Sequence, residues 1–561
     1  MPDKILVTAA LPYANGPLHL GHLAGAYIPA DVYVRYQRLK GSDVVFICGS
    51  DEHGVPITIR ANREGVSPQE IVDRYHSMMK ASFQRLGVGF DNYSRTSLPL
   101  HHRISQDFFL RLHEKGFVTE QSVSQYYCPT CRRFLPDRYI EGECPHCHRA
   151  GARGDQCESC GRWLEPEQLI SPRCKISGSV PEMRVTRHWY FRLSAFQGQL
   201  EDWQASKRGW KGNVREFSSG WFHEGLTDRS ITRDLDWGIP VPLAGAGGKV
   251  LYVWFDAPIG YISSTVEWAQ KQGAPDRWRE YWCDPKTRLI HFIGKDNIVF
   301  HAIVWPAMLM AHGDFVLPDN VAANEFLTIE GEKLSTSRNW AVWADEYLEV
   351  FPPDPLRYYL AANAPETKDA DFTWKDFQTR NNSELADVLG NLVNRSLSFV
   401  EKHFEARVPE GGEAGAQERE LWDAVGRAAR DVGASLEDFQ VRRALSQLMD
   451  LARTGNKYFN DAAPWASLKT DRARAALALR TTLELETALA VLMEPFLPFT
   501  AEKLWAMLGA AGCHRDVRWH EIARLRTRPG APLGQREILF AKIEDSVIEA
   551  QIARLHAVTR A

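Results

Sequence analysis

The chain has 561 residues, which at ~150 residues per domain corresponds to about three or four domains. Hydrophobic residues make up 44% and charged residues 25%, so a largely disordered, collagen-like or membrane-spanning chain is excluded. The net charge of −4, from 67 basic and 71 acidic residues, neither requires nor excludes a nucleic-acid partner. The first residues lack the layout of a secretion signal, and the longest apolar stretch, Ile298–Met310, is too short to span a bilayer.

The first segments of the chain alternate between strand and helix. Lys4–Ala10 (KILVTAA) is an apolar run that ends at the turn sequence Pro12–Gly16, and it predicts a buried strand. A helix is predicted from His19 through Tyr36, and Val44–Cys48 (VVFIC) predicts a second buried strand. This order favours a parallel sheet, which binds ligands at the carboxyl ends of its strands.

A cysteine-rich block at about residues 126–177 interrupts this pattern and is predicted to be an insertion. It holds seven of the ten cysteines, including the three C-x-x-C pairs Cys128/Cys131, Cys144/Cys147 and Cys157/Cys160. Without a secretion signal, metal sites are favoured over disulfides, and each pair lets two thiolates face one tetrahedral ion. We therefore predict structural zinc. A redox dithiol would need one pair beside a βαβ unit, not three in succession.

The second half of the chain returns to strands and then becomes helical. Strands are predicted at Lys249–Phe255 (KVLYVWF) and Leu289–Ile293 (LIHFI). Gly245–Lys249 (GAGGK) resembles a phosphate loop only superficially, because Leu243 and Val250 break the pattern, and it is interpreted as a hairpin turn. Beyond about residue 381, apolar residues at helical spacing predict a helical bundle.

Three helices of this bundle are predicted individually. Val441, Leu445, Leu448 and Ala452 mark the first, with Ser435 as its N-cap candidate; Leu485, Leu489 and Leu492 mark the second; and Ile543, Val547 and Ile552 mark a last helix within residues 537–561. Residues 411–415 (GGEAG) predict a loop.

Two polar motifs stand out where ligands are expected. His19-Leu20-Gly21-His22 lies at a strand-to-helix junction, where the unpaired N–H groups of a helix N-terminus favour phosphate. Gly21 leaves room for a flat base, and the two histidines are placed to donate to phosphate oxygens. Residues 333–337 (KLSTS) combine a lysine with hydroxyl groups suited to a polyphosphate. Either motif alone is commonly incidental or merely solvated; the pair is specific.

Together these motifs resemble the two signature sequences of the class I aminoacyl-tRNA synthetases, and nearly the whole chain is similar to the methionyl-tRNA synthetase family. The resemblance includes Tyr252–Tyr261 (YVWFDAPIGY), Phe292–Asn297 (FIGKDN), Phe300-His301, Asp354–Tyr359 (DPLRYY) and the cysteine insertion. It implies an α/β fold: a split Rossmann-type nucleotide-binding domain with a zinc-knuckle insertion, followed by an α-helical anticodon-binding bundle.

The resemblance also implies the boundaries of these parts. The two halves of the catalytic domain take residues 1–117 and 231–325, and the connective insertion with its zinc knuckles takes 118–230. A stem-contact segment with the KLSTS loop takes 326–380, the anticodon-binding domain 381–536 and a C-terminal helix 537–561.

The implied activity is that of a methionine–tRNA ligase, which works in two steps. ATP and L-methionine form methionyl-adenylate and pyrophosphate, and methionine then passes to the 3′ end of tRNA(Met), including the initiator, for translation initiation and elongation. The protein positions the reactants and stabilises charge without a nucleophile of its own. Magnesium is expected with ATP, without a dedicated carboxylate cage. A cytoplasmic monomer with no membrane partner is expected.

The resemblance assigns roles to individual residues. The catalytic residues it implies are His19, His22, Lys333 and Arg233, and the ATP-binding residues are Tyr13, Asn15, His19, Gly21, His22, Gly294, Asp296, Lys333, Ser335, Thr336 and Ser337. The methionine-binding residues are Ala10, Leu11, Tyr13, Asp51, Trp254, Ala257, Pro258, Tyr261, Asn297, His301 and Trp305, with Asp51 holding the ammonium group. Asn391, Arg395 and Trp465 match positions that read the anticodon. The alternatives are a structural salt bridge for Arg233 and ordinary core packing for the aromatics, Trp465 included.

The metal ligands are implied in the same way, as one complete site and one incomplete site. Cys144, Cys147, Cys157 and Cys160 match the family's common zinc site. Cys128, Cys131 and Cys174 match a second site seen in two-zinc members, but Ser177 stands where its fourth ligand is expected. One zinc per chain is therefore expected, with occupancy of the second site left open.

Two further positions depart from the family pattern. Thr336 stands where the commonest signature loop has a second lysine, with Arg338 as a candidate replacement. Asn297 stands where some members have an apolar residue.

Two other classes of protein are weighed against this assignment. The leucine, isoleucine and valine synthetases carry a larger editing insertion, and the cysteine enzyme places zinc at the amino-acid pocket. A zinc-dependent nucleic-acid-binding protein without catalysis would not need the two signature motifs.

Overall fold

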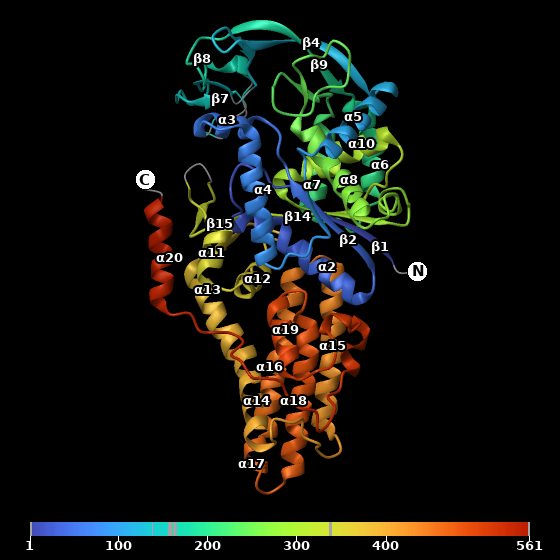
Figure 1. The fold of residues 1–561 in the computed structure, drawn as a ribbon, viewed down its shortest axis with the longest axis vertical. Coiled ribbons are helices and arrows are strands. Elements are labelled where there is room, and N and C mark those ends of the chain that lie inside the picture. Colours follow the sequence, from blue (N-terminus) through green and yellow to red (C-terminus); the bar gives the residue numbers. More distant parts are fainter. Residues whose placement is uncertain are drawn as a thin grey trace.

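The computed structural model describes residues 3–136, 139–154, 157, 160, 164, 166–335 and 339–558. The molecule is elongated and has three tiers: the cysteine-containing insertion at one end, a sheet with its helices in the middle, and a helical bundle at the other end (Figure 1). Among the described helices, none combines the length and the apolar character needed to cross a bilayer. Thr336, Ser337 and Arg338 lie outside the described residues.

The middle tier contains a parallel sheet with strand order β14-β13-β1-β2-β3. The bounds are β1 Lys4–Ala9, β2 Asp43–Ser50, β3 Asn92–Arg95, β13 Arg288–Gly294 and β14 Pro318–Asn324. Val7 pairs with Phe46 on one side and Ile290 on the other, so β1 lies at the centre. The predicted Rossmann-type sheet is confirmed.

Helices cover both faces of this sheet, which explains why its strands are apolar throughout. Val7, Phe46 and Ile290 pack into one core, and Leu6 and Val45 into the other, because successive side chains point to opposite faces. The covering elements are α1 Leu20–His22, η1 Leu23–Tyr27, α2 Ile28–Lys40, α3 Val55–Glu64, α4 Pro68–Arg85, α5 Pro99–Glu114, α8 Val253–Lys271, α9 Arg279–Trp282, η5 Lys295–Asn297, η6 Phe300–Val304 and α10 Trp305–His312.

The insertion separates the two halves of the sheet, as predicted. Its frame is the antiparallel ribbon of β4 Val118–Cys128 and β9 Glu182–Phe191, flanked by β5 Arg133–Phe134 and β10 Arg229–Ser230. A small sheet of β6 Ile140–Glu143, β7 Ala152–Arg153 and β8 Ile170–Cys174 carries cysteines. The short helix η3 Pro166–Gln168 precedes β8, and the ribbon is followed by η4 Leu193–Phe196, α6 Gln197–Ala205 and α7 Gly212–Glu224.

A connecting segment joins the sheet to the bundle. Its elements are β15 Leu327–Ile329, β16 Glu332–Lys333, α11 Ala344–Val350, α12 Pro353–Ala362, β17 Ala370–Phe372, α13 Trp374–Arg380 and η7 Asn381–Gly390. The bundle contains α14 Asn391–His403, α15 Ala416–Glu437, α16 Val441–Ala462, α17 Pro464–Ser467, α18 Arg472–Met493 and α19 Pro498–Met507, with η8 His514–Asp516 and η9 Trp519–Arg524 after it. The last helix, α20 Asp545–Val558, returns beside α13 (Figure 1).

Three predicted elements differ from the structure. Within the expected strand Lys249–Phe255, only β12 Val250–Leu251 is extended, paired with β11 Thr232–Arg233, and α8 begins at Val253. The second part of the apolar run belongs to α8, a helix buried in the core. A short apolar run is compatible with either a buried strand or a buried helix. Ser435 is no N-cap, because it lies inside α15 and donates to Gln447. The last helix starts at Asp545, after Ile543.

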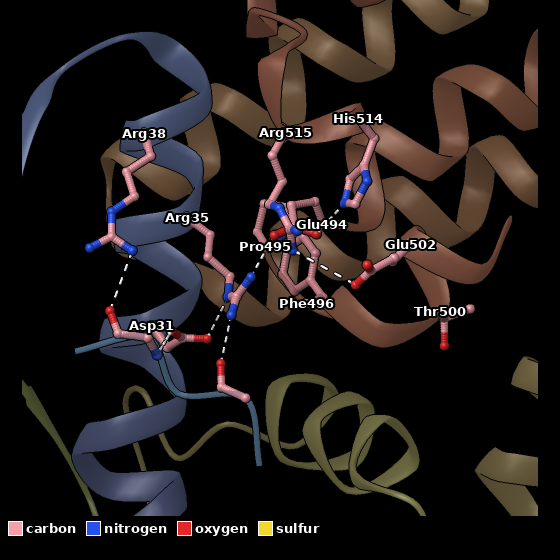
Figure 2. A network of polar contacts seen from close by, with 12 residues as sticks. Asp31, Arg35, Arg38, Glu494, Pro495, Phe496, Thr500, Glu502, His514 and Arg515 are labelled. Carbon is pink, nitrogen blue, oxygen red and sulfur yellow. Dashed lines mark hydrogen bonds and ion pairs between the residues drawn. The ribbon is translucent and has the colours of Figure 1, made fainter. Parts of the chain in front are cut away.

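Buried polar contacts join the middle tier, which contains the parallel sheet, to the bundle. Arg35 on α2 bonds Asp31 at 2.8 Å and reaches Glu494 at the end of α18 at 2.5 Å (Figure 2). Glu494 in turn contacts His514 at 2.6 Å. Arg357 on α12, which is fully buried, also bonds Asp31 at 2.7 Å. Helix α2, which continues from the HLGH motif, is thereby fixed to the bundle.

Candidate active site

A cavity of about 560 Å³ opens at the carboxyl ends of β1, β2 and β13. Parallel α/β sheets bind ligands at this edge, where the strand order reverses. The wall of the cavity is formed by the loop after β1, α1 with the HLGH motif, the residue after β2, the start of α8, the segment after β13 and β16. The lining residues named by the sequence are Ala10, Leu11, Tyr13, His19, Gly21, His22, Asp51, Trp254, Ala257, Pro258, Tyr261, Gly294, Asp296, Asn297, His301 and Lys333.

The two signature histidines are stacked at the start of α1. Their ring centroids lie 3.6 Å apart, and each Nδ1 accepts the backbone N–H of the other residue at 3.3 Å. Burial lowers the pKa of His22 to about 4, and burial together with His22 lowers the pKa of His19 well below its usual value. Both rings are therefore neutral at pH 7. Because each Nδ1 accepts, each proton resides on Nε2, which is left to donate to a ligand.

The second motif lies against the first. Leu20 donates its backbone N–H to Val342, and Ala344 donates to Leu18, so the segment after the KLSTS loop is paired with the signature turn. A Cβ on Gly21 would lie 2.5 Å from Leu334, which shows how closely the two motifs pack. Lys333 reaches the cavity wall, with its Nζ 5.9 Å from the ring centre of Phe326.

The opposite end of the cavity holds a carboxylate. Asp51 directly follows β2, and its backbone is fixed by hydrogen bonds to Pro12 and Ala14. Its side chain is 4% exposed, and burial raises its pKa well above the usual value, with a further contribution from Asp256. A cationic group entering the cavity would compensate this buried charge, because an opposite charge favours the ionised carboxylate.

Aromatic rings form the wall beside Asp51. Tyr261 on α8 lies 2.8 Å from His301 Nε2, and His301 Nδ1 lies 3.1 Å from the carbonyl oxygen of Asn297. A carbonyl only accepts, so Nδ1 of His301 carries the proton and the Tyr261 hydroxyl donates to Nε2. Burial lowers the pKa of His301 to about 4, so this arrangement persists at neutral pH. The two side chains are locked in one orientation.

Several expected residues lie outside this wall. Trp305 is fully buried in α10, stacks on Phe108 and meets Trp282 edge to face, so it packs in the core. Arg233 lies 3.7 Å over the ring of Tyr252 and donates to Ser230, and it is not among the residues that line the cavity, so its catalytic role stays a prediction. Asn15 accepts from Arg60, and Ser335 pairs with Trp340. The expected ATP contacts of Thr336 and Ser337 fall outside the described residues.

The cavity is also lined by residues to which the sequence assigned no role in the site. Phe300 stacks on Trp254 with centroids 4.0 Å apart, and Tyr27 donates to the carbonyl of Ala10 at 2.8 Å. Phe326 faces two lysines, Lys295 and Lys333. Phe300 belongs to the quoted motif Phe300-His301, so the motif could have predicted its place in the cavity. Tyr27 and Phe326 belong to no such motif, and only folding brings them to the cavity.

The first cysteine group has the geometry of a tetrahedral metal site. The sulfur atoms of Cys144 and Cys160 are 3.8 Å apart, and those of Cys147 and Cys157 are 3.6 Å apart. Four thiolates at 2.3 Å from one zinc ion lie about 3.8 Å from each other. All four sulfurs lie within 4.8 Å of one another, and none of the ten cysteines forms a disulfide. The residues fit a structural zinc ion.

The second group has three cysteines and two serines. Cys131 and Cys174 have sulfurs 3.8 Å apart, and the sulfur of Cys128 lies 3.3 Å from the hydroxyl of Ser177 and 3.1 Å from that of Ser179. The position expected for a fourth thiolate is thus taken by hydroxyl groups, which are weaker ligands of zinc.

The residues matched to anticodon reading lie on α14 and α17, and α17 is at the far end of the bundle (Figure 1). Trp465 on α17 is 47% exposed, which excludes the core alternative for this residue. The guanidinium of Arg395 lies 5.6 Å from its ring centre and donates to Asn460 at 2.9 Å. Asn391 is exposed at the start of α14. An exposed ring beside a cation suits an unpaired base.

Comparison with known proteins gives matches along the whole chain. Residues 5–397 match the tRNA synthetases class I (M), and residues 408–560 match the anticodon binding domain of methionyl tRNA ligase. The methionine–tRNA ligase of Bacteroides fragilis is 55% identical over 556 residues, 98% of this chain and 81% of that protein. That of Parabacteroides distasonis is 52% identical with the same coverage.

Solved structures are similar in both the catalytic tier and the bundle. The Mycobacterium tuberculosis methionyl-tRNA synthetase in complex with methionyl-adenylate superposes with a TM-score of 0.79 at 28% identity, covering 96% of this chain and 99% of that one. The apo form from the same organism gives a TM-score of 0.72 at 27% identity, covering 97% and 99%.

Proposed function

Since the chain belongs to the methionyl members of the class I tRNA synthetases, we propose that it activates L-methionine with ATP and charges tRNA(Met), initiator included. In the first step the methionine carboxylate attacks the α-phosphorus of ATP, the bond to the β-phosphate breaks, and methionyl-adenylate and pyrophosphate form. In the second step the terminal ribose hydroxyl of the tRNA attacks the adenylate carbonyl and AMP leaves.

One observation carries this proposal: a single cavity has a buried carboxylate at one end and two neutral imidazole donors at the other. Asp51 suits the ammonium group of an amino acid, and Nε2 of His19 and His22 suits the phosphate oxygens of ATP. A substrate bound to both ends has its carboxylate directed toward the α-phosphate. Such positioning converts a bimolecular attack into an effectively intramolecular one.

The amino-acid side chain is assigned to the aromatic wall. A thioether is polarizable and packs well against ring edges such as Trp254 and Phe300. The Tyr261–His301 pair supplies the polar contact, supported by their 2.8 Å hydrogen bond. We assign the other methionine contacts to Ala10, Leu11, Tyr13, Ala257, Pro258 and Asn297, all of which line the cavity.

The nucleotide is assigned to the other end. Gly294 ends β13 and Asp296 follows it, and these two residues suit the ribose, whereas Gly21 suits the base. Lys333 neutralises charge that moves to the pyrophosphate during the attack. Magnesium would accompany ATP and offset the negative charge of its phosphates.

An amino-acid panel in ATP–pyrophosphate exchange tests this function. We expect L-methionine to support exchange, with leucine and isoleucine lower by about 100-fold or more, because a site built around one polar contact rejects side chains that leave it unpaired. If leucine supported exchange as well as methionine does, the chain would have another amino-acid substrate. If no amino acid supported exchange, the alternative of a nucleic-acid-binding protein without catalysis would be favoured.

We infer one firm zinc site, at Cys144, Cys147, Cys157 and Cys160, and a weaker site at Cys128, Cys131 and Cys174. The sulfur spacings of the first site support a tetrahedral ion, whereas the hydroxyls of Ser177 and Ser179 weaken the second.

Metal analysis of the purified protein separates the two sites. We expect about one zinc per chain, and close to none after Cys144→Ser. The matched variant Cys174→Ser is expected to retain the first zinc. Two equivalents in the native protein, falling to one in either variant, would show both sites filled.

The remaining assignments concern partners and organisation. We propose that the bundle reads the anticodon through Asn391, Arg395 and Trp465, that the chain acts as a monomer in the cytoplasm, and that the parts are bounded at residues 117, 230, 325, 380 and 536. The exposure of Trp465 supports anticodon reading. The absence of disulfides among the ten cysteines supports a reducing compartment such as the cytoplasm. Light scattering at several protein concentrations tests the monomer.

A further inference from the structure

A buried cluster that the proposed mechanism does not use lies next to Asp51. It consists of His53 just after β2, His101 on α5 and Asp256 on α8, with 2%, 1% and 0% of their surfaces exposed. His53 Nδ1 lies 2.5 Å from Asp256 Oδ2, and His101 Nε2 lies 3.8 Å from the same oxygen. Three segments that are distant in the sequence thus meet at one carboxylate.

The cluster contacts the cavity wall from two sides. The backbone N–H of His53 donates to Asp51 Oδ1 at 3.4 Å. Asp256 directly precedes Ala257 and Pro258, which line the cavity. A shift of the bond between His53 and Asp256 would therefore move both the carboxylate of Asp51 and the wall beside it.

The short contact is a hydrogen bond and not a pair of metal ligands. Two atoms bound about 2.0 Å from one tetrahedral zinc ion lie about 3.3 Å apart, well beyond the 2.5 Å between His53 and Asp256. His101 is also occupied, because its Nδ1 lies 2.9 Å from Ser263 and its Nε2 lies 3.2 Å from Ser105.

Asp256 matters electrically because it is the second carboxylate of this region. After burial, it is the largest influence that raises the pKa of Asp51. Its Oδ1 has no hydrogen-bond partner among the described residues, so the bond to His53 carries most of its compensation. His53 thus stands between the two carboxylates.

The other titratable groups nearby are paired or neutral. Glu52 is bonded by Arg95 at 2.8 Å, with His76 at 3.7 Å. Burial lowers the pKa of His102, which faces His53, to about 4. Burial raises the pKa of Tyr261 well above its usual value, so its hydroxyl is neutral.

We propose that His53 and Asp256 are positioning residues for Asp51 and together set the acid limit of methionine binding. This inference rests on the proposed function, in which ionised Asp51 holds the methionine ammonium group. Asp256 opposes ionisation of Asp51, and His53 counteracts Asp256. The two partners of one hydrogen bond therefore act in opposite directions on the same carboxylate.

The signs follow from charge. Asp256→Asn removes the neighbouring negative charge, so the pKa of Asp51 falls and methionine remains bound at lower pH. His53→Leu removes one of the two histidine contacts that offset the negative charge of Asp256, while His101 still holds Asp256 ionised, so the pKa of Asp51 rises and binding is lost at higher pH. In the double variant the charge that His53 offsets is absent, so it should behave as Asp256→Asn does. His53→Asn keeps a donor near the Nδ1 position and should restore most of the native profile.

The test is the KM for methionine in ATP–pyrophosphate exchange between about pH 5.5 and 8.5. We expect the acid rise in KM to move by about 0.5 pH unit or more, down for Asp256→Asn and up for His53→Leu, equal to about a threefold change in KM on the acid side. The KM for ATP should not follow this pattern. Glu267→Gln, which removes a carboxylate from the same helix where it bonds Asn92, should leave the profile unchanged.

Structural damage predicts a different result, because it raises KM at every pH for both variants. Shifts in the same direction, or no shift for Asp256→Asn, would overturn the inference. If His53→Leu does not fold, the inference is tested by the direction in which Asp256→Asn shifts the acid rise in KM and by the pH profile of KM in His53→Asn. An unmodified protein without methionine-dependent exchange would refute the proposed function instead.

Discussion

At the residue scale, the cavity assigns a distinct task to each polar side chain. The neutral state of His19 and His22 follows from burial and makes them hydrogen-bond donors without a charge. Lys333 is the cation that the second motif contributes to the cavity wall, so loss of its charge should raise the free energy of the transition state.

Lys333→Ala should slow ATP–pyrophosphate exchange by about tenfold or more, equal to ~1.4 kcal/mol of transition-state stabilisation. The comparison variant is Lys368→Ala, whose side chain is exposed and outside the cavity wall. A near-normal exchange rate in Lys333→Ala would rule out this role.

Tyr261→Phe should weaken selection for methionine. The variant leaves the buried Nε2 of His301 without its donor, which costs ~1–3 kcal/mol. We expect kcat/KM for methionine to fall by about tenfold while that for leucine changes less, measured by exchange with each amino acid. An unchanged ratio between the two amino acids would show that the hydroxyl does not contribute to selection.

At the element scale, function divides between the sheet edge and the tip of the bundle. Helix α17 lies at the end of the bundle far from the sheet, whereas α19 lies near the catalytic tier (Figure 1). Trp465 is the exposed aromatic residue of α17, and Arg395 of α14 lies beside it. An effect confined to α17 should therefore leave adenylate formation intact.

Trp465→Ala should lower kcat/KM for tRNA(Met) charging by about tenfold, because base stacking on an aromatic ring contributes ~1–3 kcal/mol. ATP–pyrophosphate exchange should stay near the native rate. Phe499→Ala removes another half-exposed aromatic side chain, on α19, and serves as the control. An equal loss in both assays would indicate that Trp465 supports folding.

At the scale of the whole molecule, buried charges hold the two tiers together. Arg357 donates to Asp31 on α2, to Leu86, and to the carbonyls of Pro495 and Phe496 after α18. Burial by itself would raise the pKa of Asp31, but Arg35 and Arg357 lower it below its usual value. These contacts of Arg357, together with the contacts among Asp31, Arg35 and Glu494 in Figure 2, orient the bundle relative to α2.

Arg357→Met should reduce the free energy of unfolding by about 3 kcal/mol, because buried Asp31 loses one of its two arginine partners and the carbonyls of Pro495 and Phe496 lose their donor. Urea unfolding measures this, and Arg554→Ala, which removes an exposed ion pair with Glu346, should cost less than about 1 kcal/mol. The lowered pKa of Asp31 means that its contribution is present above the unfolded value and is lost as pH falls below about 4. A native-like unfolding midpoint for Arg357→Met would contradict the role of the network.

The sequence was sufficient for the elements whose local pattern is strong. Residues 5–7 and 44–48 are uninterrupted apolar runs, and the helical spacing of Val441, Leu445 and Leu448 left little ambiguity. It was insufficient where two conformations share one pattern, as in Lys249–Phe255, and where a cap depends on where the preceding helix ends, as for Ser435. Local propensity competes with tertiary packing at such positions.

The sequence alone determined the family, the parallel sheet, the insertion and the bundle, because short motifs and periodic apolar spacing are local properties of a chain. Only the tertiary structure decided that Phe300 and Tyr27 line the cavity whereas Trp305 and Arg233 do not, and that Ser179 joins Ser177 beside Cys128. It also brought His53, His101 and Asp256 together at one buried oxygen. The direction of a side chain and the burial of a charge depend on segments far apart in the sequence, and their packing sets them.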